Sequence, residues 1–81
     1  MTPQEIKDAA RHLYTLRLKN GAHWIRHEYK RFIIDVRKLA KQIPQDVTLE
    51  KELDLSHAQM YLDSIALREN IYLEYAPKRS K

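Results

Sequence analysis

The sequence predicts an all-α protein, a three-helix bundle in which the first two helices form an antiparallel pair and the third packs across them. Three observations favour this fold: helix-capping residues, long apolar stripes at helical spacing, and a single glycine among 81 residues. So few turn residues argue against a β protein, and the absence of cysteine excludes a disulfide framework. We therefore expect one helical domain over residues 1–76 and a basic disordered tail over residues 77–81.

The first helix is expected over residues 3–20, because characteristic residues mark both of its ends. Thr2 is a favoured N-cap, a proline follows at the first helical position, and Glu5 completes a capping box. At the other end, Asn20 and Gly21 both tolerate the left-handed backbone that terminates helices. Apolar residues at helical spacing lie between these ends.

The second helix, expected over residues 22–42, is the most regular segment of the chain. Its apolar residues step by four and three along one face: Ile25, Tyr29, Phe32, Val36, Leu39 and Ile43. This face is turned by roughly a third of a circle from that of Leu13, which favours two helices with a break at Asn20–Gly21 over one continuous helix. Pro44 is expected to end the second helix.

The third helix is expected from a second capping box, with Ser56 as cap and Gln59 reaching back, to about Tyr75. A short helical turn over residues 48–55 precedes it, with Leu49, Leu53 and Leu55 turned inward. The third helix is apolar on two faces, one comprising Ala58, Tyr61, Leu62, Ile65, Tyr72 and Leu73. The other face comprises Met60, Leu67, Ile71 and Tyr75. This second face is either covered by a neighbouring helix or forms a homodimer interface.

Charge is segregated along the chain. Residues 1–43 carry ten bases and four acids, whereas residues 44–76 carry two bases and seven acids. On the second helix basic and titratable residues gather on one strip about 120° from the apolar stripe: Lys19, His23, Arg26, Lys30, Arg37 and Lys41. The residues predicted to bind a partner are Lys19, His23, Trp24, Arg26, Lys30, Arg31, Arg37, Lys38 and Lys41. Such a strip suits a polyanion or an acidic protein surface, although it can also be a solvated face.

Trp24 lies outside the apolar stripe of the second helix. Two interpretations remain open for it. The indole ring either packs under the first helix or stays exposed as an interface anchor, where it could stack on single-stranded nucleic acid.

The residue pattern gives little support to an enzyme. No glycine-rich phosphate loop and no turn that would present a nucleophile is present. His23 and His27 stand one helical turn apart, but no further ligand is placed to complete a metal site. The second helix has few Asn, Gln or Ser residues on its basic side, so specific base reading is unsupported. We expect no catalytic residue, no metal and no cofactor.

These observations predict a small non-enzymatic binding protein that is cytoplasmic and has no membrane partner. The favoured interpretation is an inhibitor or regulator, of the kind that phages and mobile elements encode, which docks through its basic helix face on a nucleic-acid-handling protein complex. One alternative is a protein that binds the phosphate backbone of nucleic acid directly. The other is a structural or assembly subunit that works as a homodimer.

Overall fold

Three helices and no strand make up the described part of the computed structural model, which covers residues 2–21, 23–43 and 53–76. They are α1 (Pro3–Asn20), α2 (Arg26–Ala40) and α3 (Leu53–Glu69). The predicted all-α fold is therefore confirmed. The predictions for Pro44, for Leu49 and for the tail over 77–81 lie outside the described residues.

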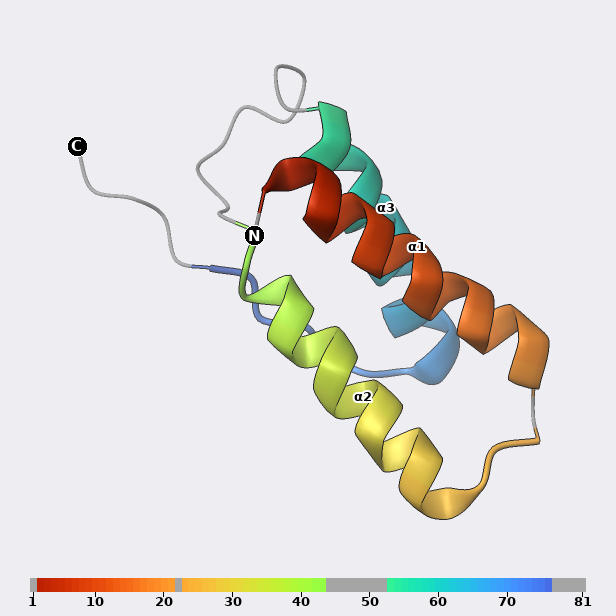
Figure 1. Cartoon of the computed structure of the whole chain (residues 1–81). Coiled ribbons are helices and arrows are strands. Elements are labelled where there is room, and N and C mark those ends of the chain that lie inside the picture. Colours follow the sequence, from red (N-terminus) through yellow and green to blue (C-terminus); the bar gives the residue numbers. More distant parts are fainter. Residues whose placement is uncertain (1, 22, 44–52, 77–81) are drawn as a thin grey trace.

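The packing of the helices differs in part from the prediction. α1 and α2 run in opposite directions, as expected, and α3 runs in the same direction as α1 (Figure 1). However, α1 packs mainly against α3, while α2 contacts both less extensively. A buried alanine on each helix, Ala10 on α1 and Ala58 on α3, favours this close pair, because the spacing of packed helices depends on the side chains between them. The third helix thus lies along α1 rather than across a pair formed by α1 and α2.

Both ends of α1 form as the sequence predicts. The Glu5 amide donates to the Thr2 hydroxyl at 3.2 Å, and the Thr2 amide donates to the Glu5 carboxylate at 2.8 Å, which completes the capping box. At the far end Gly21 has φ +57°, and its amide donates to the Arg17 carbonyl at 3.0 Å. With ψ −120° Gly21 has a positive-φ backbone that residues with a side chain rarely adopt, and it ends α1, so the break between the first two helices is confirmed.

α2 begins four residues later than predicted. Ile25 is its N-cap with an extended backbone, and the Ile25 side chain is 57% exposed rather than part of the buried stripe. Trp24 explains the late start of α2, because its ring folds back onto the helix that follows it. The centroid of the Trp24 ring lies 4.7 Å from that of Phe32 and 5.7 Å from that of Tyr29. The other residues of the predicted stripe face the core. Ile33 is buried beside them, although the prediction did not include it.

α3 begins earlier and ends earlier than predicted. It starts at Leu53, so Ser56 lies inside the helix and is not its cap; Leu53 itself is 61% exposed rather than turned inward. At the other end Asn70 has φ +57°, and the Ile71 amide donates to the Ala66 carbonyl at 3.0 Å. The helix therefore stops at Glu69, not near Tyr75.

Residues 71–75 are extended and return along the molecule toward the end of α2. Leu73 is buried, while Tyr72 is 80% exposed. The Ala76 amide donates to the Ile43 carbonyl at 3.0 Å, which fixes the end of this segment beside α2. The predicted helical face containing Tyr72 and Leu73 therefore does not form, because an extended backbone points neighbouring side chains in opposite directions.

The core is entirely apolar within the described residues. Its largest fully buried side chains are Val36, Ile43, Leu62 and Ile65. No helix in the described segments is both long enough and apolar enough to cross a membrane.

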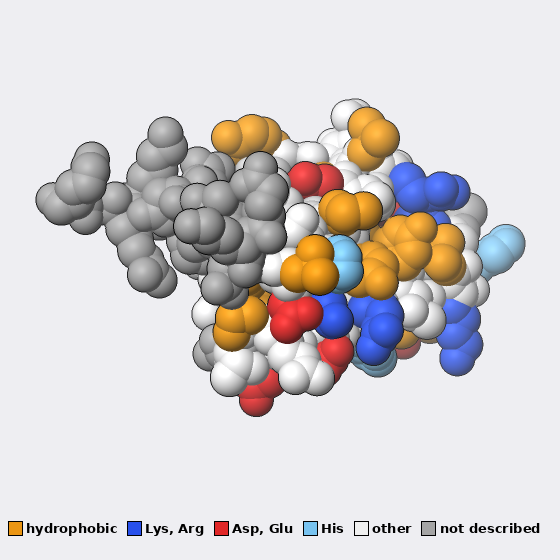
Figure 2. All heavy atoms as spheres, turned by 90° about the horizontal axis from the view of Figure 1, so that it is seen from above, with side chains coloured by type: hydrophobic (Ala, Val, Ile, Leu, Met, Phe, Trp, Pro, Cys, Tyr) orange, Lys and Arg blue, Asp and Glu red, His pale blue; other side chains and the backbone are white. Residues whose placement is uncertain are grey.

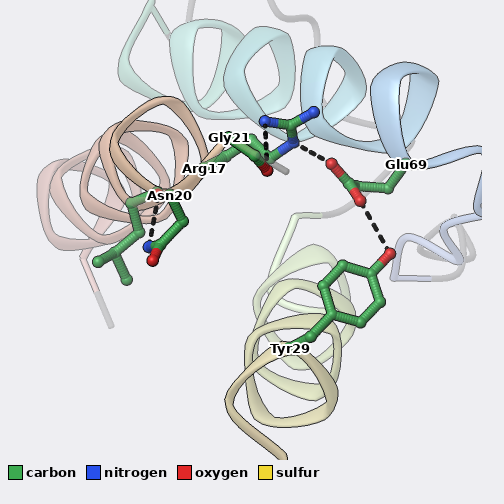
Figure 3. A network of polar contacts seen from close by, with 6 residues as sticks. Arg17, Asn20, Gly21, Tyr29 and Glu69 are labelled. Atoms are coloured by element: carbon green, nitrogen blue, oxygen red, sulfur yellow. Dashed lines mark hydrogen bonds and ion pairs between the residues drawn. The ribbon is translucent and has the colours of Figure 1, made fainter. Parts of the chain in front are cut away.

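One polar network joins the three helices where they approach one another (Figure 3). Glu69, the last residue of α3, accepts hydrogen bonds from the Arg17 guanidinium of α1 and, at 2.8 Å, from the Tyr29 hydroxyl of α2. Arg17 also donates to the Gly21 carbonyl at 3.3 Å. The Arg17 and Glu69 side chains are only 15% and 10% exposed, so this is a largely buried ion pair.

Candidate partner-binding surface

The bases of the described residues fall into two groups. Three of them pair with carboxylates: Lys7 with Asp54 at 3.1 Å, Arg11 with Asp8 at 3.6 Å, and Arg17 with Glu69. No other lysine or arginine has a carboxylate within 4.0 Å among the described residues; these are Lys19, Arg26, Lys30, Arg31, Arg37, Lys38, Lys41 and Arg68. Seven of these eight lie between residues 19 and 41, so the unpaired cations gather on α2 and the end of α1.

We define the basic surface as Lys19, Arg26, Lys30, Arg31, Arg37, Lys38 and Lys41, all of which are exposed. On α2, positions 26, 30, 37 and 41 fall within about 60° of one another on the helix circumference. Arg31 and Lys38 lie further round, and Ile34, 48% exposed, stands between the two groups. From Arg26 to Lys41 the surface extends over about 22 Å, at 1.5 Å per residue. The predicted strip of bases therefore exists as one exposed face.

Charge is also segregated between the two ends of the molecule. In the view from above, blue Lys and Arg side chains lie mostly toward the end where α1 stops and α2 begins, whereas red carboxylates lie mainly nearer the other end (Figure 2). On α2 itself, Glu28 and Asp35 lie on the edge turned toward α1, where they line a groove with Leu13. No carboxylate of the described residues lies within 4.0 Å of a cation of the basic surface, although Asp35 lines cavities with Arg31 and Lys38.

Two of the predicted site residues, His23 and Trp24, precede α2 and do not belong to the basic surface. His23 is exposed but precedes α2, so the helical spacing that would bring it beside His27 does not apply. Trp24 is half-buried against Phe32 and lines a pocket of about 600 Å³ between α1 and α2, together with Leu16. Trp24 is therefore not the exposed anchor considered from the sequence.

Within the described segments, no group of three His, Cys, Asp or Glu side chains could hold a metal ion. The indole Nε1 of Trp24 is buried and has no hydrogen-bond acceptor. The clearest pKa shifts belong to two tyrosines: partial burial and a carboxylate partner raise the pKa of Tyr29, beside Glu69, and of Tyr75, beside Asp63. Neither tyrosine belongs to the basic surface.

The predicted dimer face is only partly present. Met60 and Leu67 are 63% and 84% exposed on α3. Ile71 and Tyr75 lie beyond the helix and pack against the core, and the Tyr75 hydroxyl donates to Asp63 of the same chain. Leu53, seven residues before Met60, is also exposed, so Leu53, Met60 and Leu67 form one apolar row along α3. Of these three, only Leu53 was missing from the predicted face.

A pocket at one end of the basic surface was also missed from the sequence. It has a volume of about 350 Å³ and is lined by Arg37 and Lys41 of α2 and by Tyr72 and Glu74 of the extended segment. The signal that could have revealed it is the alternation of apolar side chains at Ile71, Leu73 and Tyr75, which is typical of an extended chain.

Fold and surface together define a small all-α protein with one exposed basic helix face. Comparisons with protein-family models, curated proteins and solved structures found no match. The function is therefore inferred from the surface itself.

Proposed function

We propose that this chain is a non-enzymatic binding protein, an inhibitor or regulator that docks through its basic surface on a nucleic-acid-handling protein complex. One observation carries the proposal: seven exposed cations on α2 and the end of α1 have no carboxylate partner among the described residues. Surface charges arranged in this way steer association with an oppositely charged body and speed the encounter.

The kind of partner follows from charge density. A row of cations about 22 Å long is complementary to an acidic patch on a protein subunit, and such complementarity steers the encounter and disfavours other partners. The phosphates of nucleic acid held by such a complex add to the attraction. Ile34, exposed between the cations, adds the apolar contact that protein interfaces use.

Site-specific photo-crosslinking in cells of the source organism tests this proposal. A photoreactive amino acid replaces Ile34 on the basic surface, and in a matched control it replaces Thr15, which is exposed on α1. We expect the Ile34 probe to crosslink to a protein subunit of a nucleic-acid-handling complex, in a product that survives nuclease digestion. Equal crosslinking from Thr15, or no protein product from position 34, would refute the docking proposal.

Direct binding to the phosphate backbone is a second candidate, supported by the pocket that Arg37 and Lys41 share with Tyr72. On this candidate the Ile34 probe yields a nucleic-acid adduct that nuclease removes. The same experiment therefore separates the two candidates.

A homodimer is a third candidate, supported by the exposed row Leu53, Met60 and Leu67 on α3. It predicts a mass near twice 9.7 kDa by light scattering. Leu67→Asp would place a charge in the interface and return the mass to that of the monomer. A monomeric wild-type protein at high concentration excludes this candidate.

A further inference from the structure

We propose that the pocket formed by Arg37, Lys41, Tyr72 and Glu74 binds an unpaired nucleotide of a single-stranded nucleic acid. In this complex Tyr72 stacks on the base, and the two cations hold the adjoining phosphates. The inference goes beyond the proposed docking on a protein complex, because it assigns a nucleic-acid ligand to the pocket at one end of the basic surface.

The position of Tyr72 is fixed by the backbone. At one end of the extended segment the Ile71 amide donates to the Ala66 carbonyl, and at the other the Ala76 amide donates to the Ile43 carbonyl, each at about 3.0 Å. Between these bonds Leu73 is 7% exposed and anchors the segment in the core. Because side chains alternate along an extended chain, Tyr72 and Glu74 must point away from the core.

The Tyr72 ring is available for stacking. It is 80% exposed, and neither another aromatic ring nor a hydrogen-bond acceptor engages it among the described residues. An aromatic ring held on a fixed backbone loses little conformational freedom when a base stacks on it. Stacking of this kind contributes substantially to single-strand binding and tolerates every base.

Arg37 and Lys41 provide the phosphate contacts. Arg37 lies in the last turn of α2, and Lys41 is its C-cap residue with a helical backbone, so the two side chains lie one turn apart on the same face. Neither has an ion-pair partner in the described parts of the chain, and both line the pocket. The volume of about 350 Å³ lies within the range of small-ligand sites, which is enough for one nucleotide.

Glu74 supplies the preference for an unpaired base. Its carboxylate would repel a phosphate, but it can accept hydrogen bonds from the amino groups of a base edge. In a duplex the Watson–Crick edge is paired and both base faces are stacked, so only an unpaired base can offer its edge to Glu74 and its face to Tyr72 together. Two cations and one carboxylate also leave the pocket with a single net positive charge, which matches one phosphodiester better than the double charge of a phosphorylated side chain.

Fluorescence anisotropy with a labelled mixed-sequence 12-mer, single-stranded or as a duplex, tests the inference at low salt. We expect the wild-type protein to bind the single strand more tightly than the duplex. Tyr72→Ala should weaken single-strand binding by about tenfold, within the range of roughly 5- to 150-fold that loss of one stacked base produces. Binding to the duplex should be unchanged, Tyr72→Phe should restore single-strand affinity, and Leu18→Ala, which removes an exposed side chain outside the pocket, should change neither.

The outcomes separate this inference from the proposed function. Equal affinity for the single strand and the duplex, or no effect of Tyr72→Ala on single-strand binding, overturns the stacking pocket. If Arg26→Glu still weakens oligonucleotide binding in that case, the role of the basic surface stands. If neither probe binds, the pocket is also refuted, and the crosslinking at Ile34 decides the proposed function independently. Tighter, Tyr72-dependent binding of a phosphorylated peptide than of the oligonucleotide would likewise refute it.

Discussion

Glu69→Gln is expected to lower the free energy of unfolding by about 3 kcal/mol, because it leaves a largely buried guanidinium without its carboxylate. Glu69 pairs with Arg17, and their side chains are 10% and 15% exposed. A domain of this size is stabilised by roughly 4–12 kcal/mol in total, so the loss is a large part of its stability. Urea unfolding followed by circular dichroism measures it.

The same substitution at Glu74 is the matched control, because that carboxylate is exposed and makes no ion pair among the described residues. We expect Glu74→Gln to change the free energy of unfolding by less than about 0.5 kcal/mol. A loss below about 1 kcal/mol for Glu69→Gln would show that the network does not hold the helices together. Should Glu69→Gln fail to fold, Tyr29→Phe removes one bond to the same carboxylate, with an expected loss of about 1.5 kcal/mol.

The network also predicts a loss of stability in alkali. Partial burial and the adjacent Glu69 carboxylate raise the pKa of Tyr29 above its usual value of about 10. The folded state therefore favours the protonated phenol, and this contribution is complete below about pH 10 and is lost as the pH rises through the folded-state pKa. The difference in stability between the wild-type protein and Tyr29→Phe should shrink above about pH 10. A difference independent of pH would contradict the assignment.

Reversing three charges on the basic surface, in Arg26→Glu/Lys30→Glu/Arg37→Glu, is expected to weaken binding to a single-stranded oligonucleotide by at least about a hundredfold. Each phosphate contact on a single strand contributes about 0.7 to the slope of log affinity against log salt, so the slope should flatten by about 2. Anisotropy titrations at several salt concentrations measure both quantities. The same triple variant should abolish crosslinking from position 34.

A matched pair of single variants separates position from net charge. Arg37→Glu and Arg68→Glu change the charge of the chain equally, and neither arginine has an ion-pair partner among the described residues. Only Arg37 belongs to the basic surface, so only Arg37→Glu should weaken binding strongly. Equal effects would mean that overall charge, and not this face of α2, drives association.

Local signals in the sequence were sufficient to predict the ends of α1 and the buried face of α2. The capping box at Thr2 and the positive-φ Gly21 are marked by residues within a turn of each helix end, so they can be predicted without knowledge of distant contacts. The buried stripe from Phe32 to Ile43 recurs at helical spacing and has one possible interior face.

The boundaries of α2 and α3 depended on tertiary contacts instead. Trp24 covers Phe32 from outside the helix, and this packing competes with continued helix at Ile25. Beyond Glu69 the apolar residues fit both a helical and an alternating pattern. The extended form is fixed by the bond to Ile43, a residue 33 positions from Ala76, which local spacing cannot reveal.

For the candidate site, the sequence by itself determined that one face of α2 carries the bases, because helical periodicity sets which side chains share a face. Only the tertiary structure decided that none of these bases forms an ion pair among the described residues, whereas Lys7, Arg11 and Arg17 do. It also decided that Tyr72 stands beside Arg37 and Lys41 rather than in the core. Ion pairing and pocket formation depend on distances between segments far apart in the chain, and those distances are set by packing.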